Sequence, residues 1–453
     1  MKRSIFLLSI LLLLSVVPAH LGAEPATPRA TIPPSAFFPV YQTGAGWAED
    51  EYTTAIAFGD VDGDGRDEAL IGRYAATGPR LLLIDDAQAG QALLWAFGQG
   101  WGAVAWPTAV AFGDVDGDGR DELAVARFTA VNERVLVFDD AAAGFAQLAL
   151  FGKEWPAEVH AVDVDFGDVD GDGRAELGVA TNAVEGPRIY VYDDASSDDA
   201  SSDDASSDDA GADFEPLWSS GETWGAPATA TAIAFGDADG DGVDEIAIAR
   251  NHDSNARYFV HEGAPDFELL LQAGETWGAG SYATDVAFGN VDDDPAEELG
   301  VARKASVNER AYVFDDAGGG FAPLYLFGQT WAFNAYVTSI AFGDVDGDDR
   351  DEVGLARVAT INERFAVFDD ALPDGDRRPF AELWGGGDEW PGQQYATAIA
   401  FGHADATTPE AELGVGRFAD SEARYFILAR GWTSWVPIVS EGSEVTGEGD
   451  PLP

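Results

Sequence analysis

The chain contains no cysteine among its 453 residues, which excludes disulfides, thiolate metal sites and cysteine nucleophiles. Basic residues are also scarce, because 25 Lys and Arg stand against 81 Asp and Glu, for a formal net charge of −56. A chain this acidic is repelled by nucleic acid and by anionic membrane surfaces. We therefore expect neither as a partner, and we expect cations as counter-species. The same composition would also suit a protein from a salty habitat.

Long apolar runs are absent except at the N-terminus. Lys2 and Arg3 precede an apolar run at 4–17, and small residues follow it. This pattern is typical of a secretory signal peptide, which we place at 1–23, with cleavage after Ala19 or Ala23. The run is too short to span a bilayer. We therefore expect a secreted, extracellular protein that does not insert into a membrane and is a monomer.

One sequence phrase returns along the whole chain. Residues 55–68 (AIAFGDVDGDGRDE) recur almost unchanged at 109–122. The Phe of this phrase stands at seven places: Phe58, Phe112, Phe166, Phe235, Phe288, Phe342 and Phe401. A Trp precedes each Phe by 11 residues: Trp47, Trp101, Trp155, Trp224, Trp277, Trp331 and Trp390. A low-complexity acidic insertion at 195–210 and a shorter one at 372–378 explain the two longest intervals between units.

Each repeat contains four short apolar segments separated by turn residues. The second unit illustrates this with 109–112, 123–127, 134–139 and 147–151. Seven units of four strands predict an all-β fold, a seven-bladed β-propeller of four-stranded antiparallel blades, over 24–439. Residues 37–41 precede the first Trp turn as a fourth strand would, so we expect them to complete the last blade. Residues 435–439 compete for that place, and 440–453 form an acidic tail that we expect to be disordered.

An acidic loop follows the first strand of each unit. We number its positions from the first Asp (position 1) to the Glu that ends it (position 9). Carboxylates stand at positions 1, 3, 5 and 9, Gly stands at position 6, and position 7 can offer its backbone carbonyl. Hard oxygen ligands at this density favour Ca²⁺ over Mg²⁺, which demands a tighter octahedral geometry. The alternative is an acidic hairpin turn without metal.

The seven loops are unequal. In the four complete loops the ligands predicted at positions 1, 3, 5, 7 and 9 are Asp60, Asp62, Asp64, Arg66 and Glu68; Asp114, Asp116, Asp118, Arg120 and Glu122; Asp168, Asp170, Asp172, Arg174 and Glu176; and Asp237, Asp239, Asp241, Val243 and Glu245. The sixth loop has Asp349 in place of Gly but keeps Asp344, Asp346, Asp348, Arg350 and Glu352. The fifth loop is weaker, with Pro295 at position 6 and Asn290, Asp292, Asp294 and Glu298 as ligands. The seventh, with His403 and Thr407, is expected to be empty. We therefore expect four to six Ca²⁺ per chain.

The phrase Phe-Gly-Asp-x-Asp-Gly-Asp-Gly resembles the FG-GAP/VCBS repeat family, which includes the propeller of the integrin α-chain. The resemblance extends from residue 37 to about 439. It implies a seven-bladed propeller with Ca²⁺ in the turns between the first and second strands of each blade. It also implies an extracellular role in binding or adhesion, without naming a ligand.

The turns on the opposite face carry Arg and Trp. Thirteen Arg flank the turns between second and third strands, and the Trp turns share that face. These residues either bind anionic or sugar ligands or only pack between blades and pair with Glu133, Glu309 and Glu363. No catalytic motif accompanies the five His. We therefore predict a non-catalytic binding or adhesion module for a protein or glycan; the alternative is a polysaccharide-active lyase or hydrolase, or an accessory module of one.

Overall fold

The computed structural model describes residues 37–86, 90–194, 214–305, 308–333, 335–359, 363–372, 379–404, 410–419, 422–430 and 439–440. The predicted signal peptide, the insertion at 195–210 and the tail beyond residue 440 lie outside these ranges. All regular elements within them are strands, and none of them is a helix that could cross a membrane.

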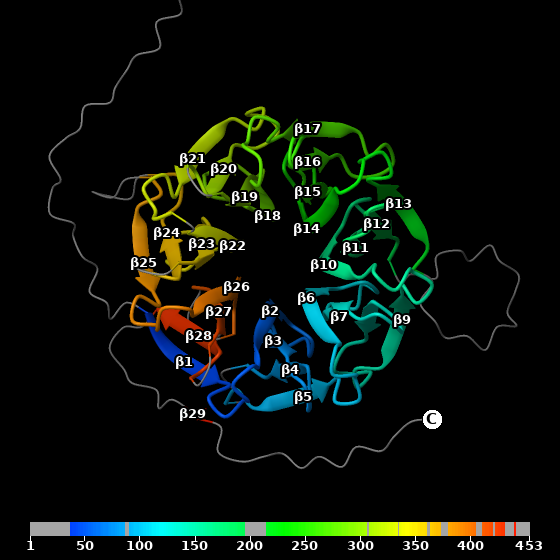
Figure 1. Ribbon diagram of the computed structural model, residues 1–453, viewed down its shortest axis with the longest axis vertical. Coiled ribbons are helices and arrows are strands. Elements are labelled where there is room, and N and C mark those ends of the chain that lie inside the picture. The colour runs from blue at the N-terminus through cyan, green and yellow to red at the C-terminus, as the bar shows by residue number, and fades with distance from the viewer. Residues whose placement is uncertain are drawn as a thin grey trace, which may run out of the picture.

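Seven four-stranded antiparallel sheets stand around a common axis, as Figure 1 shows, and they confirm the predicted all-β seven-bladed propeller. Blades 1 to 7 are numbered in chain order. The strands nearest the axis are β2 (Tyr52–Gly59), β6 (Trp106–Gly113), β10 (Ala161–Gly167), β14 (Thr229–Gly236), β18 (Tyr282–Gly289), β22 (Tyr336–Gly343) and β26 (Tyr395–Gly402). The second strands are β3 (Glu68–Tyr74), β7 (Glu122–Phe128), β11 (Glu176–Thr181), β15 (Glu245–Asn251), β19 (Glu298–Lys304), β23 (Glu352–Val358) and β27 (Glu412–Phe418).

The outer half of each blade completes the sheet. The third strands are β4 (Leu81–Ile84), β8 (Val135–Phe138), β12 (Ile189–Tyr192), β16 (Tyr258–His261), β20 (Ala311–Phe314), β24 (Phe365–Phe368) and β28 (Tyr425–Arg430). The outermost strands of blades 1 to 6 are β5 (Leu93–Phe97), β9 (Gln147–Phe151), β13 (Pro216–Ser220), β17 (Leu269–Ala273), β21 (Pro323–Phe327) and β25 (Glu382–Gly386). Second strands are buried on both faces because each blade packs against a neighbour on either side.

The ring closes through β1 (Phe37–Thr43), which pairs antiparallel with β28 and is the fourth strand of blade 7. The N-terminal closure that the sequence predicts is therefore confirmed. Phe37 and Tyr41 are buried in this strand. The competing segment 435–439 lies outside the described residues except for Val439, which pairs with the other edge of β1 through the two-residue strand β29 (Val439–Ser440).

The Phe-Gly pair at the end of each first strand has a packing role between blades. A methyl group added to the Gly of one blade would lie 2.2–2.5 Å from the Phe side chain of the next. The contact recurs at all seven interfaces, as Gly59–Phe112, Gly113–Phe166, Gly167–Phe235, Gly236–Phe288, Gly289–Phe342, Gly343–Phe401 and Gly402–Phe58. The last pair joins blade 7 to blade 1. Only glycine leaves room for this approach.

Gly167→Ala should therefore destabilise the whole propeller, because its new Cβ would lie 2.2 Å from the Cβ of Phe235. We expect a loss of about 1–3 kcal/mol in the free energy of unfolding. Gly225→Ala is the matched control, since nothing lies within 4 Å of the added methyl group. Chemical denaturation measures both. Equal stability of the two variants would contradict this account of the Phe-Gly pair.

Candidate metal centres

The acidic loops fold around the carboxylate at position 1. Asp60 accepts N–H groups from Gly63, Asp64 and Gly65, at 2.7, 3.2 and 2.7 Å. Its equivalents Asp114, Asp168 and Asp237 repeat this arrangement. Gly65 has a φ of +81°, which favours glycine at position 6.

The sixth loop tests that requirement, because Asp349 replaces Gly at position 6. Asp349 adopts a φ of +67° and donates its N–H to Asp344 at 3.0 Å. The loop thus keeps the shape of the complete ones, as expected from the tolerance of Asp for this region.

The Glu at position 9 opens the second strand and is buried. Glu68 is 0% exposed, and its Oε2 accepts the N–H of Val61 at 3.0 Å. Its Oε1 has no hydrogen-bond partner among the described residues. Six blades share this arrangement, with Glu68, Glu122, Glu176, Glu245, Glu298 and Glu352. An unpartnered buried carboxylate oxygen is costly unless a proton or cation neutralises it.

Burial accordingly raises the pKa of each of these six carboxyls far above its ordinary value. The pKa rises to about 8 for Glu68, Glu245 and Glu298. It rises to about 9 for Glu122, Glu176 and Glu352. Neighbouring loop aspartates add to the effect in every case, so a nearby cation would restore the charged form.

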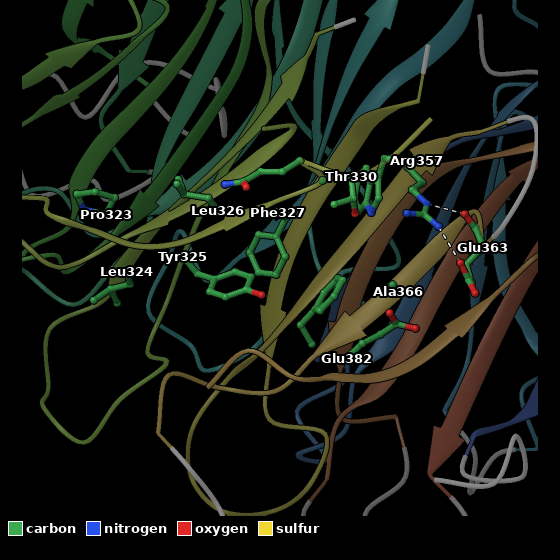
Figure 2. Close-up of a pocket in the computed structure, with 14 residues that line it drawn as sticks. Pro323, Leu324, Tyr325, Leu326, Phe327, Thr330, Arg357, Glu363, Ala366 and Glu382 are labelled. Carbon is green, nitrogen blue, oxygen red and sulfur yellow. Dashed lines mark hydrogen bonds and ion pairs between the residues drawn. The ribbon is translucent and has the colours of Figure 1, made fainter. Parts of the chain in front are cut away.

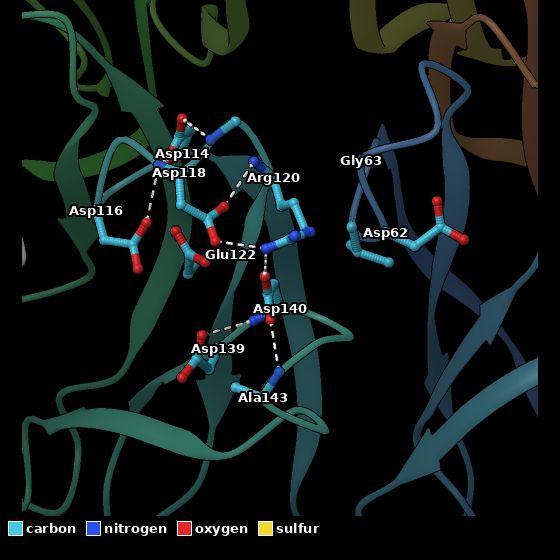
Figure 3. Close-up of polar contacts among 12 residues, drawn as sticks. Asp62, Gly63, Asp114, Asp116, Asp118, Arg120, Glu122, Asp139, Asp140 and Ala143 are labelled. Carbon is cyan, nitrogen blue, oxygen red and sulfur yellow. Dashed lines mark hydrogen bonds and ion pairs between the residues drawn. The ribbon is translucent and has the colours of Figure 1, made fainter.

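The structure brings the predicted ligands of the loops together. Carboxylate oxygens of Asp60, Asp62 and Glu68 all lie within 4.8 Å of one another. Those of Asp114, Asp116 and Glu122 do the same in blade 2, where Figure 3 shows Glu122 beneath the loop. A third group consists of Asp168, Asp170 and Asp172.

Position 7, predicted as a ligand through its carbonyl, has a further role that the sequence analysis missed. The Arg66 side chain pairs with Asp64 at position 5 and reaches Asp86 at 3.0 Å. Arg120, Arg174 and Arg350 make the same two contacts in blades 2, 3 and 6. The Arg therefore compensates part of the negative charge in four loops, whereas Val243 offers none.

A second pair of acids, also missed, follows the third strand in blades 1, 2, 3, 5 and 6. In blade 1 these are Asp85, the first acid, and Asp86, the second acid. Their carboxylate oxygens lie within 4.8 Å of Glu68, and Asp139 and Asp140 lie equally close to Glu122. The sequence contains a signal for the first acid, because an acidic residue stands 25 residues after position 1 in six units: Asp85, Asp139, Asp193, Glu262, Asp315 and Asp369.

The fifth and seventh loops depart from the others. In the fifth, Asn290 donates its side-chain N–H to the carbonyl of Asp294 at 2.6 Å. Glu298 nevertheless keeps its unpartnered Oε1. In the seventh, His403 donates its backbone N–H to Asp67 of blade 1, whereas 405–409 lie outside the described residues.

Backbone hydrogen bonds connect the loops around the ring. The N–H at position 8 of each loop donates to the carbonyl at position 1 of the preceding blade's loop, at 2.7–3.0 Å. The seven bonds run from Asp67 to His403, Asp121 to Asp60, Ala175 to Asp114, Asp244 to Asp168, Glu297 to Asp237, Asp351 to Asn290 and Ala411 to Asp344. A ligand that stiffens one loop therefore acts on two blades.

On the opposite face, the repeated Arg and Trp have structural partners. Arg73 stacks over Trp47 at 4.3 Å, and five other blades repeat this contact. A buried Arg directly precedes the third strand of each blade. In blade 1 this is Arg80, which donates an N–H to the carbonyl of Gly98 in the Trp turn at 3.2 Å. Arg357 also pairs with Glu363 at 3.1 Å. These contacts favour the packing interpretation of the Arg and Trp.

A groove of about 590 Å³ lies between blades 5 and 6. Figure 2 shows Tyr325 and Phe327 of β21 on one side and Arg357, Glu363 and Glu382 of blade 6 on the other. A second groove, of about 480 Å³, occupies the corresponding position between blades 3 and 4, beside Trp224 and Arg250. The first combines aromatic faces with charged hydrogen-bonding groups.

Three further aspartates lie on strands next to the axis. Asp163 and Asp285 accept N–H groups from Ile233 and Ile340 of the next blade, at 3.0 and 2.9 Å. Burial raises the pKa of Asp285, and that of Asp165, to about 7, and it raises the pKa of Asp163 well above its usual range. The position of Asp163 and Asp285 holds Ala in four other blades, and the position of Asp165 holds Ala in all six others, so these acids break the repeat.

Among repeat families, residues 106–131 match the FG-GAP repeat. The matched segment holds β6 and the acidic loop of blade 2, and it confirms the resemblance there. None of the curated proteins matches this chain in sequence.

Several solved structures are similar in fold. Raptor of Chaetomium thermophilum is 12% identical over 88% of this chain, with a TM-score of 0.53, and this chain spans only 29% of the Raptor chain. BBS1N, solved in complex with ARL6DN, is 13% identical, with a TM-score of 0.52 and coverage of 88% of this chain and 98% of that one. The Dos1 propeller is 12% identical, with a TM-score of 0.50 and coverage of 86% and 80%. These identities establish the propeller fold alone.

The inner aspartates make stability depend on pH. Because the pKa of Asp285 is higher in the folded chain than in an unfolded one, its contribution is complete below about pH 4 and is lost as pH rises towards 7. The free energy of unfolding of Asp285→Ala, relative to the parent chain, should therefore improve by about 2–3 kcal/mol between pH 5 and pH 8.

Asp50→Ala provides the control for the loss of an exposed aspartate. Denaturant titrations at both pH values and one Ca²⁺ concentration measure the difference. A pH-independent difference for Asp285→Ala would show that this carboxyl titrates normally in the folded chain.

Proposed function

We propose that this chain is a secreted, calcium-binding β-propeller that acts as a non-catalytic binding or adhesion module for an extracellular protein or glycan. Secretion is supported by the signal-like residues at 1–23. The FG-GAP match and the seven-bladed fold are consistent with this role. The protein acts as a monomer and does not bind nucleic acid.

The observation that supports calcium best is the unpartnered buried Oε1 at position 9, repeated in six blades. It lies among loop carboxylates whose oxygens are within 4.8 Å in blades 1 and 2. Bound Ca²⁺ would supply the missing positive charge and take about six to eight oxygen ligands. The residues that would hold it are those at positions 1, 3, 5 and 9, with the backbone carbonyl of position 7.

Removal of the metal should lower the melting temperature markedly, and Ca²⁺ should restore it. Each site contributes about 2.7 kcal/mol when free Ca²⁺ is a hundredfold above its Kd, because the ion binds only the folded state. Calorimetric titration of chelator-treated protein should count four to six Ca²⁺.

Asp62→Ala should remove one ion and part of the response to EDTA. Asp405→Ala, in the degraded seventh loop, is the matched control and should remove none. A count of zero or one, with no effect of EDTA on melting, would mean that the loops are only acidic hairpins.

The groove between blades 5 and 6 is the candidate ligand site. Its size suits a small ligand or a short stretch of polymer. Tyr325, which is 38% exposed, offers its ring to the apolar side of a sugar, while Glu363 and Glu382 accept hydrogen bonds from hydroxyl groups. Phe327 is buried and supports the Tyr325 ring from below the surface. This chemistry favours a glycan over a protein as occupant. A comparable groove between blades 3 and 4 would add avidity for a repeated ligand.

Binding to a glycan array should identify a ligand whose Kd rises at least tenfold in the double variant Tyr325→Ala/Glu382→Gln, a loss of about 1.4 kcal/mol or more. Leu150→Ala is the control, because Leu150 is an exposed residue at the position of β9 that corresponds to Leu326 in the groove. The melting temperature should change little in either protein.

Two results would redirect the proposal. Equal glycan binding by the parent chain and the groove variant would place the ligand site elsewhere. Cleavage of a polysaccharide by purified protein would overturn the non-catalytic part and support the lyase or hydrolase alternative.

A further inference from the structure

The buried Glu at position 9 lies between two groups of acids. On one side of Glu68 are Asp60 and Asp62 of the loop, and on the other are Asp85 and Asp86 of the third strand. Each group has carboxylate oxygens within 4.8 Å of one another and of Glu68. Figure 3 shows the same arrangement in blade 2 around Glu122. Glu68 thus lies close to carboxylates from two separate parts of the blade.

Existing hydrogen bonds leave only some of these oxygens available. Both oxygens of Asp60 accept N–H groups of the loop, and Arg66 pairs with Asp86. Asp62 accepts the backbone N–H of Asp64 at 3.2 Å, and Asp85 accepts that of Asp86 at 3.0 Å, each through Oδ1. Among the described residues, the oxygens that accept no hydrogen bond are therefore Oδ2 of Asp62, Oε1 of Glu68 and Oδ2 of Asp85.

Blade 2 repeats this distribution. Through Oδ1, Asp116 accepts the backbone N–H of Asp118 at 3.0 Å, and Asp139 accepts that of Asp140 at 2.9 Å. Oε1 of Glu122 has no hydrogen-bond partner among the described residues. The hydrogen bonds that Asp116 and Asp139 accept from these residues leave their Oδ2 atoms available. Two blades thus present the same three oxygens, one of them from the third strand.

Natural variation between blades separates the roles of the two third-strand acids. Blade 4 has Val243 in place of the loop Arg, and Gly263 there replaces the second acid. The first acid is nevertheless retained as Glu262. Blade 5 also lacks the Arg, with Ala296 at position 7, and it keeps both acids as Asp315 and Asp316. The first acid is therefore present whether or not the loop carries the Arg.

Blade 7 supplies the complementary comparison. Its loop has lost the Asp at position 1, where His403 stands. By strand register, in which Leu413 pairs with Leu428 as Ala69 pairs with Ile84, the first acid is replaced by Ala429. The first acid is thus absent from the blade whose loop has lost the carboxylates of both position 1 and position 5, as His403 and Thr407, and it is present in the other six.

We propose that the first acid of the third strand is an additional ligand of the ion held by the acidic loop. It is Asp85, Asp139, Asp193, Glu262, Asp315 or Asp369 in blades 1 to 6. The inference rests on the proposed calcium binding. It makes each centre a link between the loop and the third strand, so that the ion fixes three strands of a blade rather than one hairpin.

The test counts Ca²⁺ ions by native mass spectrometry, in paired variants of blades 1 and 2. Asp85→Asn/Asp139→Asn should lose two ions at a Ca²⁺ concentration that saturates the parent chain. Asp85→Glu/Asp139→Glu should retain them, since Glu262 occupies this position naturally. Asp86→Asn/Asp140→Asn is the control for the acid that pairs with Arg and should also retain them. Asp62→Asn/Asp116→Asn should lose two ions as the loop reference.

The outcomes separate this inference from calcium binding itself. If the loop reference loses two ions and Asp85→Asn/Asp139→Asn loses none, the inference is wrong and the proposed function stands. Loss of two ions only in Asp86→Asn/Asp140→Asn would assign the ligand to the second acid and overturn it as well. If the parent chain binds no Ca²⁺, both fail together. Melting in EDTA excludes misfolding, because Asp85→Asn/Asp139→Asn should then melt no lower than the parent chain.

Discussion

The hydrogen bond from position 8 of each acidic loop to position 1 of the loop before it places every candidate metal centre at a junction between blades. The Phe-Gly contacts lie beside these bonds and fix how closely neighbouring blades approach. Because both interactions recur at all seven interfaces, including the one from blade 7 to blade 1, the ring is uniform at this level. A cation in one loop would therefore stabilise the ring and not only its own blade.

The two faces of the propeller are held by different chemistry, and neither needs a disulfide. On one face, carboxylates gather at densities that require compensation by protons, arginine or cations. On the other, buried Arg side chains bind the carbonyls of the Trp turns, and a second set of Arg stacks on the Trp rings. The scarce basic residues of the chain are thus concentrated where the fold uses them, which leaves the acidic loops short of positive charge.

Some features of the structure differ between blades and are not part of the repeat. The groove beside Tyr325 and the aspartates next to the axis are such departures. The FG-GAP match and the similarity to other propellers concern the shared scaffold, which hosts many unrelated functions. The repeat thus supports stability, and the exceptions mark places where a ligand or a change in pH would act.

The seven blades, their four strands and the closure through residues 37–43 were predictable from the sequence, because the repeat is nearly exact and strand order follows chain order. The grouping of the loop carboxylates was predictable as well, since they lie within nine consecutive residues. Burial of Glu68, the pairing of Arg66 with Asp86 and the approach of Asp85 were decided only by the tertiary structure. The same holds for the contact of Asp285 with the next blade. These contacts join residues far apart in the chain, and their geometry depends on how strands and neighbouring blades pack, which no local pattern records.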